Sequence, residues 1–158
     1  MKHFSAEKYN LAWFKLAECV SRGEKERALG VYRLLSHSVG DDALSTQLYA
    51  DILLSFDDKD GAIEKYLQAA ELYKKNCKLI EAIAVYEHLL FLQKNCQDHV
   101  VELCCLYFKL NLEFKVVEHL DKLISNKKIN NSLNLSDFLD KLKVKDEDIY
   151  SYILLYLE

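Results

Sequence analysis

Cysteine and histidine are the side chains in this sequence that could bind a metal, and their closest grouping is Cys96, His99, Cys104 and Cys105. A structural zinc ion needs four convergent ligands. His99 and Cys104 are five residues apart, so a helix would point them to different faces. We therefore expect no metal site, and nothing else in the sequence indicates a cofactor.

Motifs of the common catalytic sites are also missing. The sequence contains no glycine-rich phosphate loop, no HExxH, no GxSxG and no CxxC. Its five histidines are dispersed along the chain. We expect a protein that binds rather than catalyses, and only a deep polar pocket with perturbed titratable groups would indicate an enzyme.

The elements that must position these side chains are predicted to be helices. The 158 residues include four glycines and no proline, whereas β-sandwiches and barrels use both in their many turns. The length indicates one domain, or two at most. A formal net charge of −4 argues against a nucleic-acid-binding module, which usually has a basic surplus.

The sequence shows no secretory signal and no membrane segment. Residues 1–8 lack an apolar stretch with a small-residue cleavage site, and no window approaches the roughly 18 apolar residues that span a bilayer. The five cysteines are odd in number and scattered, which is typical of a reducing compartment. We expect a cytoplasmic protein.

Helical periodicity extends over most of the chain. The predicted helices are 5–21, 24–38, 42–56, 60–75, 79–94, 97–110, 113–125, 136–143 and 147–157. Predicted N-caps are Ser45 or Asp42, Asp60 and Ser136. Asparagine tolerates the left-handed conformation that ends helices, which predicts stops at Asn76, Asn95, Asn111 and Asn126.

Small residues recur along these helices at regular intervals. One set is Ala28, Ala62, Ala82 and Val116, whose successive intervals in the numbering are 34, 20 and 34. A second set in the preceding helices is Ala17, Ala50, Ala70 and Cys104. Each member of the second set precedes its counterpart in the first set by 12 residues, except Ala17, which precedes Ala28 by 11 residues. Because small side chains let antiparallel helices approach closely, this pattern predicts stacked hairpins that share a core.

These residues resemble the tetratricopeptide repeat family, whose unit is a helix–turn–helix of about 34 residues. The likeness is closest to bacterial members, covers roughly residues 9–125, and is carried by 48–53 with 61–66 and by 69–73 with 81–86. The family's proline is absent, and its tryptophan is present only as Trp13. The resemblance implies a right-handed solenoid of about seven repeat helices (residues 1–125), followed within the same domain by a polar loop and two short capping helices (126–158). The interval of 20 implies that helix 60–75 closes one repeat and opens the next.

The resemblance further implies that the first helix of each hairpin lines a concave groove. Counting from the second set of small residues, the groove positions are Leu11, Phe14, Glu18, Leu44, Gln47, Asp51, Leu54, Glu64, Leu67, Glu71, Lys74, Asp98, Val101 and Phe108, together with Ser21 and Cys105. Eight of these sixteen are apolar, five are acidic and one is basic. We expect a basic, amphipathic protein or peptide partner. The alternative is that the acids are simply a solvated surface of a chain with 29% charged residues.

The last predicted helix carries more apolar side chains than a terminal helix needs. Its apolar residues include Ile149, Tyr152, Ile153 and Tyr156, which indicate either a cap folded back on the last repeat or a homodimer contact. The functional prediction is a non-catalytic interaction module that binds a peptide or helical segment. The alternatives are a small chaperone for a secreted or aggregation-prone client, and an assembly segment of a larger complex.

Overall fold

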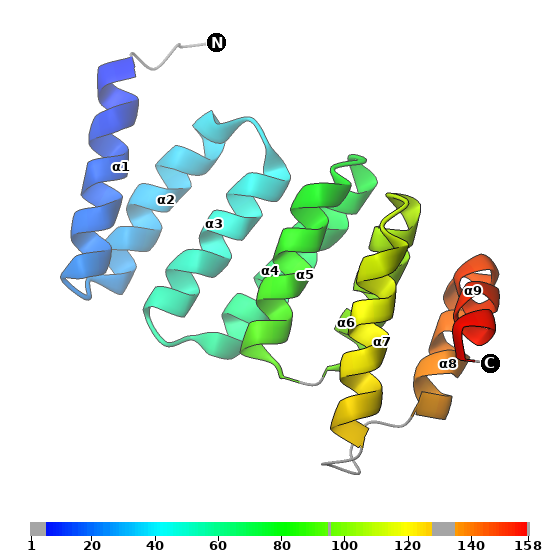
Figure 1. The fold of residues 1–158 in the computed structure, drawn as a ribbon. Coiled ribbons are helices and arrows are strands. Elements are labelled where there is room, and N and C mark those ends of the chain that lie inside the picture. Colours follow the sequence, from blue (N-terminus) through cyan, green and yellow to red (C-terminus); the bar gives the residue numbers. More distant parts are fainter. Residues whose placement is uncertain (1–5, 95, 128–134, 158) are drawn as a thin grey trace. The chain divides into compact units, whose positions relative to one another are not determined.

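A computed structural model describes residues 6–94, 96–127 and 135–157, and these residues form helices joined by short connections (Figure 1). The helices are α1 (Ala6–Ser21), α2 (Lys25–Val39), α3 (Asp42–Ser55), α4 (Lys59–Lys75), α5 (Leu79–Leu92), α6 (Gln97–Lys109), α7 (Glu113–Lys127), α8 (Leu135–Lys145) and α9 (Glu147–Leu157). The predicted all-α fold is confirmed, and the helix bounds agree with the prediction to within two residues. None of the described helices is long and apolar enough to cross a bilayer.

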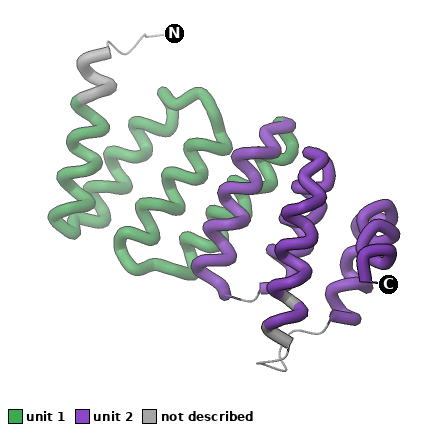
Figure 2. The backbone as a smooth tube through the Cα atoms, in the orientation of Figure 1, with its two compact units in different colours: residues 1–76 green, residues 77–158 purple. Residues whose placement is uncertain are grey.

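The helices form two compact units, residues 1–76 and 77–158, called unit 1 and unit 2 (Figure 2). In unit 1, α1 packs against α2, α2 against α3, and α3 against α4. In unit 2, α5 packs against α6 and α6 against α7, whereas α8 and α9 pack on each other and on α6. The predicted division between residues 125 and 126 separates repeat helices from C-terminal helices and stays a prediction.

Small residues occupy the centre of both units, as their spacing predicts. Ala28, Ala62, Ala82 and Val116 are fully buried, and so are Ala50, Ala70 and Cys104. With no side chain beyond Cβ or a short branch, these positions allow neighbouring helices to approach closely. These small residues, which recur along the sequence, therefore occupy buried positions in the structure.

The first helix departs from the predicted register by one residue. Ala17 is exposed, whereas Leu16 and Cys19 are buried at 4% and 9% exposure. Leu16 precedes Ala28 by 12 residues, which is the interval found in the other hairpins. Leu16 therefore occupies the position that Ala50, Ala70 and Cys104 occupy in their helices. One residue turns an α-helix by about 100°, so every position counted from Ala17 is rotated by that amount.

Five of the described residues have a left-handed backbone; Gly40, with φ 68° after α2, stands outside the spacing, and the other four recur at the intervals of the small residues. Gly23, Asp57, Cys77 and Asn111 have left-handed φ angles of 70°, 60°, 58° and 56°, and their successive intervals are again 34, 20 and 34. After three of them the next N–H donates to a carbonyl five residues earlier: Glu24 to Cys19 (2.9 Å), Asp58 to Leu53 (3.0 Å) and Leu112 to Tyr107 (2.9 Å). This bond pattern is the Schellman motif, which satisfies carbonyls left open at a helix end.

The observed caps correct several predicted ones. Asp41 caps α3 by accepting from the N–H groups of Ala43 (3.0 Å) and Leu44 (3.2 Å), and Asp58 caps α4 by accepting from Gly61 (3.2 Å). The predicted caps Asp42, Ser45 and Asp60 are therefore wrong, because each lies inside its helix. Ser136 also lies inside its helix, and Asn126 does not end α7. At the α4–α5 turn the left-handed residue is Cys77 rather than Asn76, whose φ is −87°, and Asn95 lies outside the described residues.

Candidate binding surfaces

The predicted groove residues of α3 lie on one face of that helix in unit 1. Leu44 is 49% exposed, Asp51 is exposed, and Gln47 and Leu54 are half-buried. The helical spacing of three, four and three residues places all four side chains on one side. This surface of α3, with the tyrosines of α4 whose hydroxyls reach it, is called the α3–α4 face.

Tyrosines of α4 bind the two polar residues of this α3 surface. The hydroxyl of Tyr66 donates to Asp51 Oδ1, and the hydroxyl of Tyr73 donates to Gln47 Oε1 at 2.9 Å. Burial and the bond to Asp51 raise the pKa of Tyr66, so its hydroxyl stays protonated at neutral pH. These bonds engage the polar groups and leave Leu44 and Leu54 as the apolar contribution of α3.

The predicted groove residues of α4 share one side of that helix by their spacing. Glu71 is exposed, while Leu67 and Lys74 are half-buried. Glu71 and Lys74 form an ion pair of 2.5 Å one turn apart. Glu64, at the N-terminal end of the same side, is exposed and pairs with Lys65 at 3.5 Å. This side of α4 is therefore charged but internally paired.

The predicted groove residues of α1 lie on a different side of their helix. Leu11 and Phe14 are 61% and 75% exposed, and Glu18 is exposed and pairs with Arg22 at 2.7 Å. Because the packing residue is Leu16, these three positions are rotated by about 100° from those equivalent to the α3 surface. Their assignment to the same groove as the α3 residues stays a prediction, and counting from Leu16 instead gives Asn10, Trp13 and Ala17 as the equivalent residues.

All five acidic groove positions have an intramolecular partner. The partners are Arg22 for Glu18, Tyr66 for Asp51, Lys65 for Glu64, Lys74 for Glu71 and Lys141 for Asp98. Exposed ion pairs are individually weak, but they neutralise the local charge that a basic ligand would otherwise meet. In unit 1 the exposed apolar residues are therefore better evidence for the chemistry of a partner than the acidic residues are.

Helices α8 and α9 pack over α6 and cover part of its predicted groove residues, whereas Asp98, near the start of α6, stays exposed. Val101 and Cys105 are buried at 3% and 5% exposure. The half-buried ring of Phe108 lies 5.6 Å from the ring of Tyr152 on α9. In this structure Val101 and Cys105 are thus covered, and the assignment of the α6 residues to a ligand-binding groove stays a prediction.

The side of α8 and α9 that faces the interior is apolar. Phe138 and Leu142 of α8 and Ile149 and Ile153 of α9 are all fully buried. Ile149 and Ile153 are therefore not available for the predicted homodimer contact. Of the other two residues named for that contact, Tyr152 is half-buried and Tyr156 is 45% exposed, with its hydroxyl 3.3 Å from Asp121 Oδ1 of α7.

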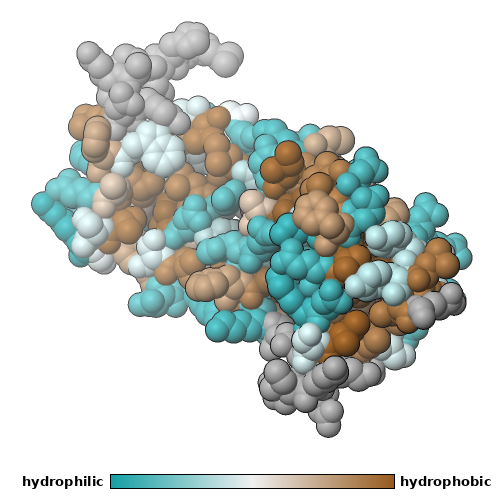
Figure 3. Space-filling view, in the orientation of Figure 1, coloured by the Kyte–Doolittle hydropathy of each residue, from teal (hydrophilic) through white to brown (hydrophobic). Residues whose placement is uncertain are grey.

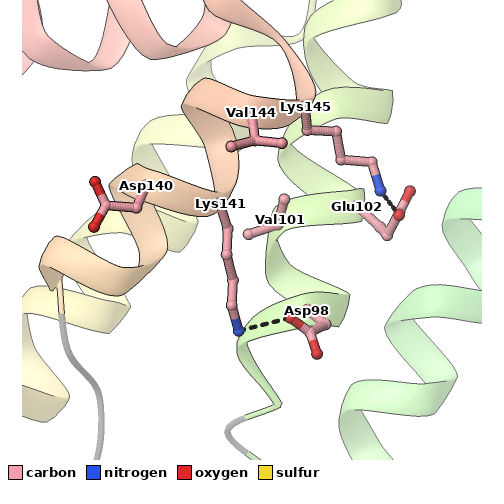
Figure 4. A pocket seen from close by; sticks show the side chains of 7 residues that line it. All are labelled: Asp98, Val101, Glu102, Asp140, Lys141, Val144 and Lys145. Atoms are coloured by element: carbon pink, nitrogen blue, oxygen red, sulfur yellow. Dashed lines mark hydrogen bonds and ion pairs between the residues drawn. The ribbon is translucent and has the colours of Figure 1, made fainter.

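Charged residues line the contact between α6 and α8. Lys141 Nζ lies 2.8 Å from Asp98 Oδ1, and Lys145 pairs with Glu102. The bond from Lys141 holds the pKa of Asp98 below its usual value. An open cavity of about 680 Å³ runs beside these pairs and is lined by Asp98, Val101, Glu102, Asp140, Lys141, Val144 and Lys145 (Figure 4).

Sequence reasoning did not find Glu102, Lys141 or Lys145, although a signal was present. The two lysines are four residues apart, as are Asp98 and Glu102. Residues at that spacing share one face of a helix. Two such pairs of opposite sign in separate helices could have suggested the contact.

The cysteine and histidine grouping is used in packing. Burial raises the pKa of the Cys104 thiol to about 12, so the thiol stays protonated. His99 is also buried, its Nε2 lies 2.8 Å from Gln93 Oε1, and burial lowers its pKa. Among the residues that the structure describes, no group of three or more His, Cys, Asp or Glu side chains could hold a metal ion.

No protein-family model matches the sequence, and no curated protein matches it. The functional assignment therefore rests on the fold and on the surfaces described above.

Proposed function

We propose that this protein is a non-catalytic protein-interaction module, built as a tetratricopeptide-like stack of antiparallel helix hairpins, and that the α3–α4 face of unit 1 binds an amphipathic helix of another protein. The left-handed turns and the buried small residues recur at the same three intervals, which supports the repeat architecture. A helix laid into a surface of this kind is one of the common modes of peptide recognition.

One observation carries the assignment: the equivalent positions of α6 contact helices of the same chain. Counting from Ala50 in α3 and from Cys104 in α6, Leu44 corresponds to Asp98 and Leu54 corresponds to Phe108. Asp98 pairs with Lys141 of α8, and the ring of Phe108 lies against the ring of Tyr152 of α9. The same positions of α3 carry two leucines, of which Leu44 is 49% exposed.

The residues of the α3–α4 face indicate the chemistry of the partner. Leu44 and Leu54 supply apolar contact, and the hydroxyls of Tyr66 and Tyr73 engage Asp51 and Gln47 between them. An amphipathic helix fits this arrangement, because its apolar stripe buries the leucines while its polar side stays in solvent. The space-filling view shows hydrophobic surface over α1 to α3 of unit 1, interrupted by hydrophilic side chains (Figure 3).

The proposal is tested with helical peptides selected by display on the full wild-type chain. Each selected peptide is labelled, and its dissociation constant is measured by fluorescence anisotropy on wild type and on the Leu44→Glu variant. Leu44→Glu should weaken binding by about tenfold or more, because it places a charge in the apolar contact. Ala17→Glu, on the equivalent side of α1, should weaken binding as well.

Ile80→Glu is the matched control, since Ile80 is a 72% exposed aliphatic residue of α5 in unit 2. It introduces the same charge on the surface and should leave the affinity unchanged. Peptides that bind Leu44→Glu as tightly as wild type, or that lose affinity equally in both variants, would place the binding surface elsewhere.

A further inference from the structure

The contact between α6 and α8 contains two ion pairs in matching register. Lys141 lies 2.8 Å from Asp98, and Lys145 pairs with Glu102. Both lysines and both acids are four residues apart, so α8 runs parallel to α6 and the pairs lie one turn apart. Figure 4 shows the two lysines reaching from α8 to α6, with Val101 between the pairs and Asp140 pointing away.

Helix α8 has the composition of a basic amphipathic helix. Phe138 and Leu142 form its buried side, and both are fully buried. Lys141 and Lys145 flank this apolar side and meet the acids of α6. The occupant of α6 in this structure is thus an apolar stripe bordered by two lysines at positions i and i+4.

The ion-paired edge of this contact is open to solvent. The Lys141 and Lys145 side chains are 40% and 41% exposed and that of Asp98 is 72% exposed, whereas that of Glu102 is 15% exposed. A cavity of about 680 Å³ lies along the seam, and Val144 of α8 is 91% exposed beside it. An ion pair as exposed as Lys141–Asp98 is weak and sensitive to salt, so it contributes more to the choice of a partner by charge than to the strength of binding.

We propose that the α6 face (Asp98, Val101, Glu102, Cys105 and Phe108) is a second binding site, specific for a basic amphipathic helix, and that α8 is its built-in occupant. A helix of another protein with an apolar stripe and two lysines at i and i+4 replaces α8 on this face. This inference rests on the proposed function only in the assumption that the first helix of a hairpin binds a helix of another protein. The two proposals concern different units, and this one requires a basic partner.

Tethering makes α8 a strong competitor for its own site. A segment joined to the same chain acts at a high effective concentration, so a free helix must match both the apolar stripe and the lysines to displace it. Weakening the lysine contacts of α8 should therefore open the site to a helix supplied in trans.

The test uses the full chain and a fluorescein-labelled peptide of residues 135–157 as the probe. The double variant Lys141→Glu with Lys145→Glu repels its own α8 from Asp98 and Glu102. It should bind the probe at least tenfold more tightly than wild type does. If this variant does not fold, as judged by circular dichroism, the milder Lys141→Gln with Lys145→Gln variant is measured for the same gain.

Charge exchange gives the matched control. The double variant Asp98→Lys with Glu102→Lys should reject the native peptide and bind a peptide carrying glutamate at both lysine positions. That peptide should not bind wild type. Binding of both peptides to both chains would show apolar association without the proposed charge recognition, and would overturn the inference.

The reactivity of Cys105 reports directly on whether α8 and α9 leave α6. In a background with Cys19→Ala, Cys77→Ser and Cys96→Ser, Cys105 should react slowly with a thiol reagent, because it is 5% exposed and the other remaining cysteine, Cys104, is fully buried. Adding the lysine substitutions should speed the reaction, and adding unlabelled probe peptide should slow it again. A Cys105 that stays unreactive in a lysine variant that also fails to bind the probe would show that α8 and α9 are a fixed cap.

Two further outcomes distinguish this inference from the function proposed for the α3–α4 face and from dimerisation of the chain. Leu44→Glu should leave probe binding to the Lys141→Glu, Lys145→Glu chain unchanged, so the two proposed faces can fail independently. If the wild-type chain instead forms dimers that the lysine substitutions abolish in analytical ultracentrifugation, the occupant is α8 of a second copy. That result would overturn the choice of a foreign helix.

Discussion

Tyrosine hydroxyls join neighbouring helices at the edge of the core. Tyr66 donates to Asp51, and Tyr107 donates to Glu87 across the α6–α5 contact. Both rings are buried, at 2% and 4% exposure. In both cases burial raises the pKa of the phenol, and the bond to the carboxylate raises it further. Each tyrosine thus combines apolar packing with one polar contact at the tip of the ring.

These raised pKa values predict a loss of stability in alkali. The unfolded chain releases the two phenolic protons near pH 10, whereas the folded chain retains them, so the free energy of unfolding falls as the pH rises above 10. The fall is at most about 1.4 kcal/mol per pH unit for each tyrosine. Urea unfolding of wild type and of Tyr66→Phe with Tyr107→Phe between pH 9 and 11 measures it.

The double phenylalanine variant should be less stable at pH 8, because it lacks both hydrogen bonds, but its stability should fall less steeply above pH 10. Other groups titrate in the same range in both proteins, so the difference between the two slopes is the relevant quantity. Parallel slopes would show that the two hydroxyls titrate alike in the folded and unfolded chains.

Helix register is the property that decides which surface each helix presents. In α1 the buried packing residue is Leu16, and Ala17 next to it is exposed. In α4 both small positions, Ala62 and Ala70, are fully buried, so one helix carries the packing residues of both sets.

The register of α1 predicts opposite effects at adjacent positions. Leu16→Ala should lower the free energy of unfolding by about 2–4 kcal/mol, because it removes a buried side chain and leaves a cavity. Ala17→Leu should change it by no more than about 0.5 kcal/mol, because the added atoms stay in solvent. Thermal or urea unfolding monitored by circular dichroism measures both, and the reverse order would restore the register counted from Ala17.

The helices and their small core residues could be predicted because both depend on local sequence periodicity. The register of α1 could not, because the packing position holds a leucine and the adjacent alanine looks more like its counterparts. The left-handed turn at Cys77 was also missed, since its neighbour Asn76 has the side chain that usually adopts that conformation. Docking of α8 on α6 depends on contacts between residues 43 positions apart, such as Asp98 and Lys141, which no local pattern specifies.

At the scale of the molecule, the same packing environment recurs in both units. Ala62 belongs to unit 1 and Ala82 to unit 2, and both are fully buried at equivalent positions of the repeat. The shared environment implies that a change tolerated or rejected in one unit is treated alike in the other.

Enlarging either alanine should therefore cost a similar amount. Ala62→Leu and Ala82→Leu should each lower the free energy of unfolding by about 1–3 kcal/mol through overpacking. Ala84→Leu serves as the control, because Ala84 is exposed on the same helix as Ala82 and has room for a larger side chain. A large loss of stability at only one of the two buried alanines would show that their matching places in the sequence pattern do not reflect equivalent packing.

The left-handed turns at Gly23, Asp57, Cys77 and Asn111 also mark positions at which a whole segment could be inserted or deleted while the backbone conformation at the junction is kept. Because the chain leaves each of these helices in the same conformation, a crossover between two such points joins compatible ends. Recombination between the first two would duplicate or delete the segment 24–57, and recombination between the second and third would duplicate or delete the segment 58–77. Internal duplication and loss in relatives of this chain should therefore occur in steps equal to the lengths of those two segments.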